Sequence, residues 1–223
     1  MSSKTLSAAE TKDQLLWVAK EMLRINLVQG TAGNLGARLP DGNAVLTPSS
    51  LDYTEMTLED LVVTDLDGNV LEGERSPTTE KALHLSALRM HDDINATMHC
   101  HARHATMFAL TRQSIPAVIE EFVVYVGGDV PVAAYRTTGS DELAEEVARH
   151  VGDRSAVLMA NHGLFAVGKD PDDVLHVASL VERTAEIVWG ANRLGEIVPL
   201  PDGTQDTFAR YYRYGRTGSF DPA

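Results

Sequence analysis

Two histidines stand at alternate positions of an apolar segment, Ile94-Asn95-Ala96-Thr97-Met98-His99-Cys100-His101. The apolar residues at 94, 96 and 98 predict a buried strand over residues 94–101. Successive side chains of a strand point to opposite faces, so His99 and His101 share a face, about 7 Å apart along the strand. Two imidazoles in this arrangement can bind one divalent metal, often zinc. The alternative is two surface histidines on an exposed strand, which the apolar neighbours disfavour.

A metal held by this pair needs a third neutral ligand, and two histidines are candidates. His104 lies in a helix predicted from about Ala102 to Leu110, where it can equally face solvent. His162 lies in Asn161-His162-Gly163, at the end of a predicted buried strand, and turns of this kind often direct side chains into a site. We therefore prefer His162. The other histidines lie on or beside predicted helices and are assigned structural or solvent-exposed roles: His84, His91, His150 and His176.

The segment Ser76-Pro77-Thr78-Thr79-Glu80 begins a helix predicted to run to about Met90. A negative charge such as that of Glu80 is favoured in the first turn, and this helix-end effect alone can explain the residue. However, hydroxyls and free backbone amides at a helix start are also the components of an anion site. The glycines of Gly30-Thr31-Ala32-Gly33-Asn34 allow a similarly close approach of backbone to ligand, without the lysine of a Walker loop.

Two adjacent carboxylates, Glu120 and Glu121, precede the apolar run Phe122–Val126, and residues 121–126 are predicted to form a strand. Neighbouring strand residues face opposite sides, so this arrangement allows one of the two carboxyls to be buried. Burial raises the pKa of a carboxyl and allows it to act as an acid or base. An exposed strand end is the alternative.

The remaining patterns predict one α/β domain over residues 1–223 with a mixed, largely antiparallel sheet. A capping box at Ser7-Ala8-Ala9-Glu10 begins a helix that ends near Asn26. Two hairpins follow, with turns at Pro40–Asn43 and Asp67-Gly68. The other predicted elements are helices over 141–151 and 171–194 and strands over 130–135, 156–160 and 164–167.

The amino-acid composition excludes several classes of protein and of binding partner. With 223 residues and 43% apolar content, the chain can bury one sizeable core, which excludes a disordered or fibrous protein. The net charge of −13 argues against nucleic acid or an anionic membrane as the partner. Cys100 is the only cysteine, which fits a cytoplasmic location. We find no signal-peptide core in residues 1–10 and no apolar run of about 18 residues.

The last sixteen residues, 208–223, form an aromatic tail containing Phe208, Tyr211, Tyr212, Tyr214 and Phe220. Disordered tails are poor in aromatic residues, so the tail is expected to dock. Two docking surfaces remain open, the tail's own domain and a neighbouring subunit.

Taken together, the motifs from about Gln14 to Gly215 resemble the class II aldolase/adducin family, most closely its L-fuculose-1-phosphate aldolase branch. The matching segments are Gln29–Asn34, Leu46–Ser49, Ser76–Glu80, Asn95–His101, Ser114–Ala117, Asn161–Gly163 and Tyr214-Gly215. Their order and spacing make a chance match very unlikely. The resemblance implies an α/β/α layered fold and a homotetramer with active sites between subunits.

The resemblance also implies one zinc ion per subunit, with manganese or cobalt as alternatives, bound by His99, His101 and His162. It gives Glu80 the role of a metal ligand or proton carrier. It places the substrate phosphate on Asn34, Ser49, Ser50, Thr78 and Thr79, and a catalytic tyrosine for the neighbouring subunit on Tyr214. The expected reaction is cleavage of a ketose 1-phosphate, similar to L-fuculose 1-phosphate or a 5-deoxypentulose 1-phosphate, to dihydroxyacetone phosphate and a small aldehyde.

Three departures from the aldolase pattern involve four positions. Ser50 replaces a glycine, and Thr78 and Thr79 replace paired serines. Glu120 stands where these aldolases carry a catalytic tyrosine, while related epimerases and dehydratases use a carboxylate in this region. A sugar-phosphate 4-epimerase or dehydratase is therefore the alternative activity. A non-enzymatic adducin-like module is a remote one, because adducin lacks an intact metal site.

Overall fold

The computed structural model describes residues 6–218, which fold around one eight-stranded sheet with the order β4-β3-β2-β1-β5-β8-β7-β6. The strands are β1 (Asn34–Arg38), β2 (Ala44–Leu46), β3 (Val62–Thr64), β4 (Val70–Glu72), β5 (Ala96–Cys100), β6 (Val132–Ala133), β7 (Ala156–Met159) and β8 (Gly163–Gly168). Only the β6–β7 pairing is parallel; the other six are antiparallel. The expected α/β fold with a mixed, largely antiparallel sheet is confirmed.

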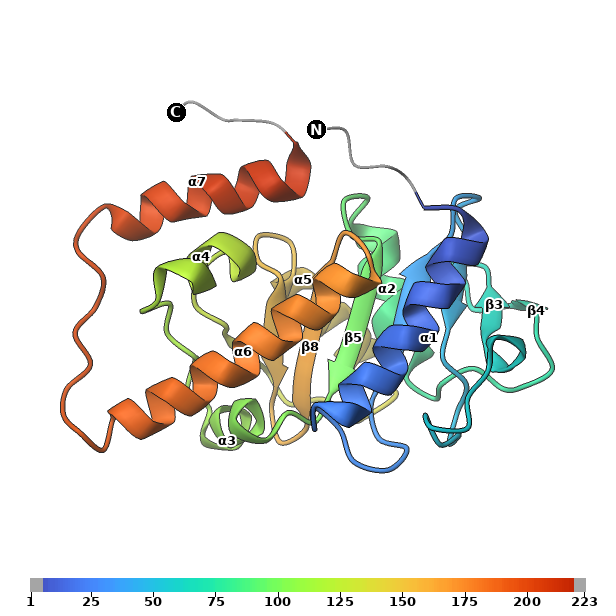
Figure 1. The fold of residues 1–223 in the computed structure, drawn as a ribbon, viewed down its shortest axis with the longest axis horizontal. Coiled ribbons are helices and arrows are strands. Elements are labelled where there is room, and N and C mark those ends of the chain that lie inside the picture. Colours follow the sequence, from blue (N-terminus) through green and yellow to red (C-terminus); the bar gives the residue numbers. More distant parts are fainter. Residues whose placement is uncertain (1–5, 219–223) are drawn as a thin grey trace.

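Helices cover both faces of this sheet (Figure 1). They are α1 (Ala8–Arg24), the 3₁₀ turn η1 (Leu58–Asp60), α2 (Lys81–Met90), α3 (Arg103–Thr111), α4 (Glu120–Val126), α5 (Asp141–His150), α6 (Pro171–Ala191) and α7 (Thr204–Thr217). One buried cluster joins α1 and α6 to one face of the sheet, and another joins α2 and α5 to the opposite face. The result is the layered α/β/α arrangement that the family resemblance implied.

Strand β5 lies inside the sheet, between β1 and β8. Met98 and Cys100 belong to the cluster beneath α1 and α6, so Thr97 and His99 point to the opposite face, toward α2. All five strand residues are buried. The apolar alternation that predicted this strand therefore also sets which way its histidines face.

Local side-chain caps account for the starts of three of the seven α-helices in residues 6–218. Ser7 and Glu10 form the predicted capping box of α1, with the Glu10 carboxylate accepting from the Ser7 amide at 2.8 Å. Asp170 caps α6, whose first residue is Pro171. Ser140 caps α5 by accepting from the Leu143 amide at 3.2 Å.

The predicted strand over residues 121–126 is wrong, because this segment is the helix α4. Phe122, Val123 and Val126 are buried at helical spacing, which places them on one face against the core. The helix ends at Gly127, whose φ of +97° is unfavourable for other residues. The neighbouring predicted strand over 130–135 is shortened to the two residues of β6.

The aromatic tail forms α7, which packs against α4 of its own chain (Figure 1). Tyr212 is buried, and its hydroxyl lies 3.0 Å from that of Ser155. Tyr211 and Tyr214 remain 51% and 47% exposed. The tail therefore docks on its own domain through one face and leaves aromatic side chains on the other. Phe220 and the rest of the predicted tail beyond residue 218 lie outside the described residues.

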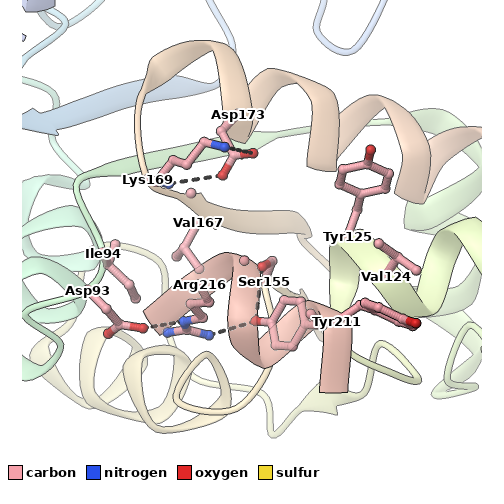
Figure 2. Close-up of a pocket in the computed structure, with 13 residues that line it drawn as sticks. Asp93, Ile94, Val124, Tyr125, Ser155, Val167, Lys169, Asp173, Tyr211 and Arg216 are labelled. Carbon is pink, nitrogen blue, oxygen red and sulfur yellow. Dashed lines mark hydrogen bonds and ion pairs between the residues drawn. The ribbon is translucent and has the colours of Figure 1, made fainter. Parts of the chain in front are cut away.

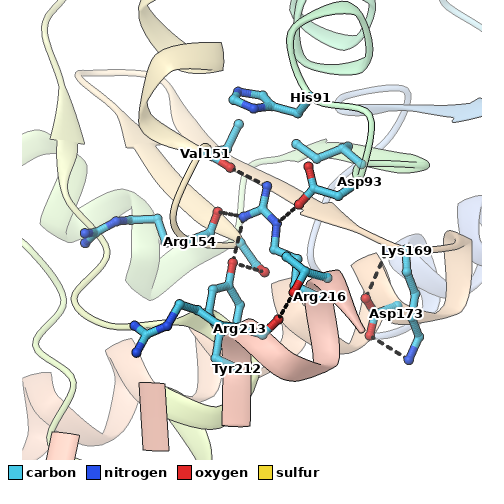
Figure 3. Close-up of polar contacts among 12 residues, drawn as sticks. His91, Asp93, Val151, Arg154, Lys169, Asp173, Tyr212, Arg213 and Arg216 are labelled. Atoms are coloured by element: carbon cyan, nitrogen blue, oxygen red, sulfur yellow. Dashed lines mark hydrogen bonds and ion pairs between the residues drawn. The ribbon is translucent and has the colours of Figure 1, made fainter. Parts of the chain in front are cut away.

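Arg216 forms the polar anchor of α7 (Figure 3). Its guanidinium donates to the Asp93 carboxylate, to the Tyr212 hydroxyl at 2.8 Å, and to the carbonyls of Val151 at 2.8 Å and Arg154 at 3.1 Å. Only 11% of the Arg216 side chain is exposed. A cavity remains beneath the helix, bordered by residues such as Tyr125, Tyr211 and the Lys169–Asp173 pair (Figure 2).

Within residues 6–218 we find no helix with the length and apolarity required to cross a lipid bilayer.

We expect Arg216→Met to loosen α7, because it removes four hydrogen bonds and leaves the Asp93 carboxylate without its cation. The expected loss of unfolding free energy in urea is about 2 kcal/mol, and proteolysis within residues 192–203 should accelerate. The exposed Arg213 on the same helix supplies the matched control, Arg213→Met. Equal stability of the two variants would contradict the anchoring role.

Candidate metal centre

Three histidines converge where β5 ends and β8 begins. His99 is the fourth residue of β5, His101 follows the strand directly, and His162 lies in the turn before β8. Antiparallel pairing of Cys100 with Leu164 brings these chain segments together. One nitrogen from each of the three rings lies within 4.8 Å of the others. The preferred third histidine, His162, is thus the one that the fold brings to the pair.

The turn that carries His162 depends on its two neighbours. Asn161 has a φ of +56°, a left-handed conformation that asparagine tolerates better than most residues. A Cβ atom at Gly163 would lie 2.5 Å from the Cys100 carbonyl oxygen and 3.3 Å from the His99 ring. Only glycine therefore allows β8 to start this close to the end of β5, which explains the Asn-His-Gly sequence.

Glu80 adds a carboxylate to the three rings. It is 7% exposed; Oε2 lies 3.4 Å from His99 Nε2, and Oε1 lies 3.4 Å from His162 Nε2. The sequence placed Glu80 in the first turn of its helix, but it is the N-cap residue of α2, and its side chain does not cap that helix. Its carboxylate instead points to the histidines, which argues against the helix-end explanation for this residue.

The pKa values of all three imidazoles are lowered, which favours the neutral form in which imidazoles ligate metals. Desolvation and the neighbouring rings of His162 and His101 hold the pKa of His99 well below its usual range. Burial also lowers the pKa values of His101 and His162, and in both cases the Glu80 charge opposes this effect. His99 Nδ1 donates to the Leu164 carbonyl at 3.0 Å, which leaves the Nε2 lone pair directed into the cluster.

The spacing of these atoms fits a metal. His99 Nε2 and His101 Nε2 are 3.1 Å apart, and each Glu80 oxygen is 3.4 Å from a histidine nitrogen. Ligands at the corners of a tetrahedron, each about 2.1 Å from zinc, are separated by roughly 3.4 Å. Glu80 Oε1 is also buried without a hydrogen-bond partner among the described residues. The donor set and the spacing therefore suit a divalent cation.

The five residues expected to bind phosphate lie on three segments around Glu80. Asn34 begins β1 and donates from Nδ2 to Glu80 Oε2 at 2.9 Å. Thr78 is buried, and its hydroxyl accepts from the Glu80 amide at 3.2 Å, whereas Thr79 is exposed. Ser49 is half-buried and Ser50 exposed, with their hydroxyls 3.3 Å apart.

Backbone hydrogen bonds hold two of these segments together: the Ser49 amide donates to the Ser76 carbonyl and the Thr78 amide to the Thr47 carbonyl, both at 3.0 Å. Ser50 has a φ of +57°, the left-handed region in which glycine is favoured. Glycine would adopt this conformation at lower cost, which fits the glycine that the family resemblance led us to expect at this position.

The structure does not bring Glu120 or Tyr214 to the histidines of the same chain. Both lie on the packed pair α4 and α7; Figure 1 shows α7 along the top with α4 beneath it, and α3, which begins two residues after His101, at the bottom. Glu120 and Glu121 are both exposed, and Glu121 lies 3.7 Å from Arg183. The alternative of an exposed segment end therefore holds for both carboxyls, although the segment is a helix and not a strand.

His104, the alternative third ligand, contacts Glu182 and is not part of the histidine cluster. Its Nδ1 lies 2.8 Å from Glu182 Oε1, and its backbone amide also donates to the Glu182 carboxylate. Glu182 thereby caps the start of α3.

His84 is a further residue near the centre, and its sequence position was interpreted only as structural or solvent-exposed. It is fully buried behind Asn34 and Glu80. Its position four residues after Glu80, on the same helix face, was the available signal.

The fold and this site together match a known family. The model of the class II aldolase and adducin N-terminal domain matches residues 13–189. The chain belongs to the class II aldolase/adducin family.

Individual relatives of the chain support this family assignment. A 5-deoxy-D-ribulose 1-phosphate aldolase of Bacillus thuringiensis serovar kurstaki is 34% identical over 92% of this chain and 97% of its own length. An L-fuculose phosphate aldolase of Escherichia coli is 34% identical over 84% of this chain and 86% of its own length. A solved structure described as L-fuculose 1-phosphate aldolase is 36% identical, with a TM-score of 0.87 over 95% of this chain and 100% of that chain. The expected enzyme class, a class II aldolase, is confirmed.

We expect His99→Ala to lose most bound divalent metal, because it removes a buried ligand whose lone pair faces the cluster. His104→Ala is the matched control, since its ring bonds to Glu182 instead. Metal content per folded chain, measured by elemental analysis, separates the variants. Equal loss of metal from both would show that the ligand set is misassigned.

Proposed function

We propose that this protein is a zinc-dependent aldolase that cleaves a ketose 1-phosphate to dihydroxyacetone phosphate and a small aldehyde. The observation that carries the proposal is the convergence of three neutral imidazoles and the Glu80 carboxylate, with neighbouring spacings of 3.1–3.4 Å. The names of the relatives support substrates resembling 5-deoxy-D-ribulose 1-phosphate or L-fuculose 1-phosphate. Manganese or cobalt can replace zinc with the same donor set.

His99, His101 and His162 would hold the metal, one per subunit, with Glu80 as a further ligand before substrate enters. The bound metal would act as a Lewis acid and stabilise the negative charge that develops on the substrate's C2 oxygen as the C3–C4 bond breaks. Cleavage also needs a base to take the proton from the C4 hydroxyl and an acid to return a proton to C3. Glu80 would carry the proton to C3; in support, its Oε1 lies 3.4 Å from His162 Nε2 and has no hydrogen-bond partner among the described residues.

The base for the C4 hydroxyl would come from Glu120 or Tyr214 of a neighbouring subunit. Both are exposed on α4 and α7, and Figure 1 shows α7 on the opposite side of the molecule from α3, the helix that begins two residues after His101. This separation supports active sites between subunits, and we propose a cytoplasmic homotetramer of single-domain chains. The buried, unpaired Cys100 is consistent with the reducing cytoplasm.

The substrate phosphate would bind to Asn34, Ser49, Ser50, Thr78 and Thr79. The hydroxyls of Ser49, Ser50 and Thr79 are accessible, and they lie beside the N-terminus of α2, whose free amides favour an anion. Asn34 and Thr78 contact Glu80 directly. Phosphate binding at this place would convert remote binding energy into orientation of the bond that breaks.

The decisive experiment incubates the enzyme with ketose 1-phosphates, ketose 5-phosphates and the unphosphorylated sugars, and measures dihydroxyacetone phosphate. We expect its release from ketose 1-phosphates only. An inverted C4 centre without net cleavage would instead identify the epimerase, and loss of water the dehydratase. The carboxylate of Glu120, at the tyrosine position of the aldolases, is what favours these alternatives. Absence of any turnover would leave the adducin-like module.

We expect Glu120→Gln to lower kcat by about 10²–10⁴, the usual loss on removal of a general acid or base. The substitution keeps the side-chain shape, so metal content should be unchanged. Glu121→Gln, one residue further on the same exposed turn, is the control and should retain activity. If Glu121→Gln is the impaired variant, Glu121 is the base. If neither is impaired, the proposal for Glu120 fails and Tyr214 remains.

A further inference from the structure

His84 is buried on α2, one helical turn beyond Glu80, with none of its surface exposed. Its ring packs at 5.8 Å from that of Phe165, the β8 residue paired with His99. Both ring nitrogens have polar partners: Nδ1 lies 2.8 Å from Thr97 Oγ1, and Nε2 lies 2.7 Å from Asn34 Oδ1. Because both ring nitrogens of this fully buried histidine have polar partners, we expect the residue to orient those partners as well as to pack in the core.

These contacts continue to the metal centre. Asn34 Nδ2 donates to Glu80 Oε2 at 2.9 Å, so one chain of hydrogen bonds joins Thr97, His84, Asn34 and Glu80. All four residues are buried. They come from α2, from the segment directly before it, and from the adjacent strands β1 and β5.

The direction of each hydrogen bond follows from the charges. A carboxylate only accepts, so Asn34 must present its amide nitrogen to Glu80 and its oxygen to His84. The oxygen requires an N–H on His84 Nε2. Burial lowers the pKa of His84 to about 3, so the ring is neutral and carries a single proton. Nδ1 therefore accepts from the Thr97 hydroxyl, whose other acceptor, the Gly36 carbonyl, is further away at 3.2 Å.

We propose that His84 is a positioning residue for Glu80: it fixes the amide of Asn34, which holds Oε2 by a hydrogen bond beside His99 and leaves Oε1 facing His162. This inference rests on the proposed function, in which Glu80 Oε1 handles the proton at C3. Without the N–H of His84, the buried Asn34 Oδ1 has no donor, and the amide is no longer fixed in the position from which Nδ2 holds Glu80 Oε2. The Glu80 carboxylate would then lose its defined orientation toward the histidines.

The kinetic test compares His84→Phe with His84→Gln. Phenylalanine fills the space without polar atoms, whereas glutamine can still donate an N–H toward Asn34 Oδ1. We expect kcat of His84→Phe to fall about 10–100-fold, the usual effect of losing a partner behind a metal ligand, while metal content changes little. His84→Gln should recover most of the loss. Wild-type kcat in folded His84→Phe would overturn the proposal, as would equal losses in both variants.

A second pair of variants tests the same chain of hydrogen bonds if His84→Phe does not fold. Thr97→Val keeps the side-chain shape but removes the hydroxyl that donates to Nδ1, and Thr97→Ser retains it. We expect a lower kcat for the valine variant and near wild-type kcat for the serine variant. Equal kcat in the two variants would contradict a role for this hydroxyl in fixing His84.

A measurement without substrate separates this inference from the proposed function. In ¹⁵N-histidine-labelled protein, NMR correlation spectra show which ring nitrogen of His84 carries the proton. We expect Nε2–H in the wild type at neutral pH, and an Nδ1–H ring would overturn the proposal. If the spectra show Nε2–H but no ketose phosphate is cleaved, the hydrogen-bond chain stands and the proposed function fails.

Discussion

The antiparallel pairing of β5 with β8 is the constraint on which the rest of the site depends. It brings the turn of His162 beside the end of β5, where His99 and His101 lie, and the absence of a side chain at Gly163 allows the two segments to meet. The same pairing supplies the Leu164 carbonyl that orients His99. Helix α2 then adds Glu80 from its N-cap position. The centre is thus built from the middle of the sheet, where all five residues of β5 are buried and its flanking strands fix its position.

Much of this arrangement could be predicted from the sequence, because it follows from short-range patterns. Alternation along 94–101 gave His99 and His101 a common face, and the glycine after His162 marked a tight turn. The features that could not be predicted correctly depend on long-range contacts or on a pattern that fits both a strand and a helix. The run after Glu120 is β-branched and apolar, which suits a strand, but tertiary packing of Phe122, Val123 and Val126 selects a helix and exposes both glutamates. The link from His84 to Glu80 through Asn34 joins residues 46 and 50 positions apart, which no local pattern shows.

The residues expected to act in catalysis divide into two groups in the fold. Glu80, the three histidines and the hydroxyl-bearing segments gather at one end of β5, whereas Glu120 and Tyr214 lie on α4 and α7. Helix α7 is anchored by the buried Tyr212 and Arg216, so its exposed tyrosines are held on a rigid element. This division is the structural reason for proposing that a complete active site requires a second subunit.

The central claim is that one divalent metal at His99, His101 and His162 makes this protein a ketose 1-phosphate aldolase. Titration of metal-depleted enzyme with zinc, while the release of dihydroxyacetone phosphate is followed, tests it most directly. Activity should rise linearly and reach its maximum at one zinc per chain, because the described residues form one such cluster. Full activity in the metal-depleted enzyme, or a maximum that requires more than one metal per chain, would contradict the claim.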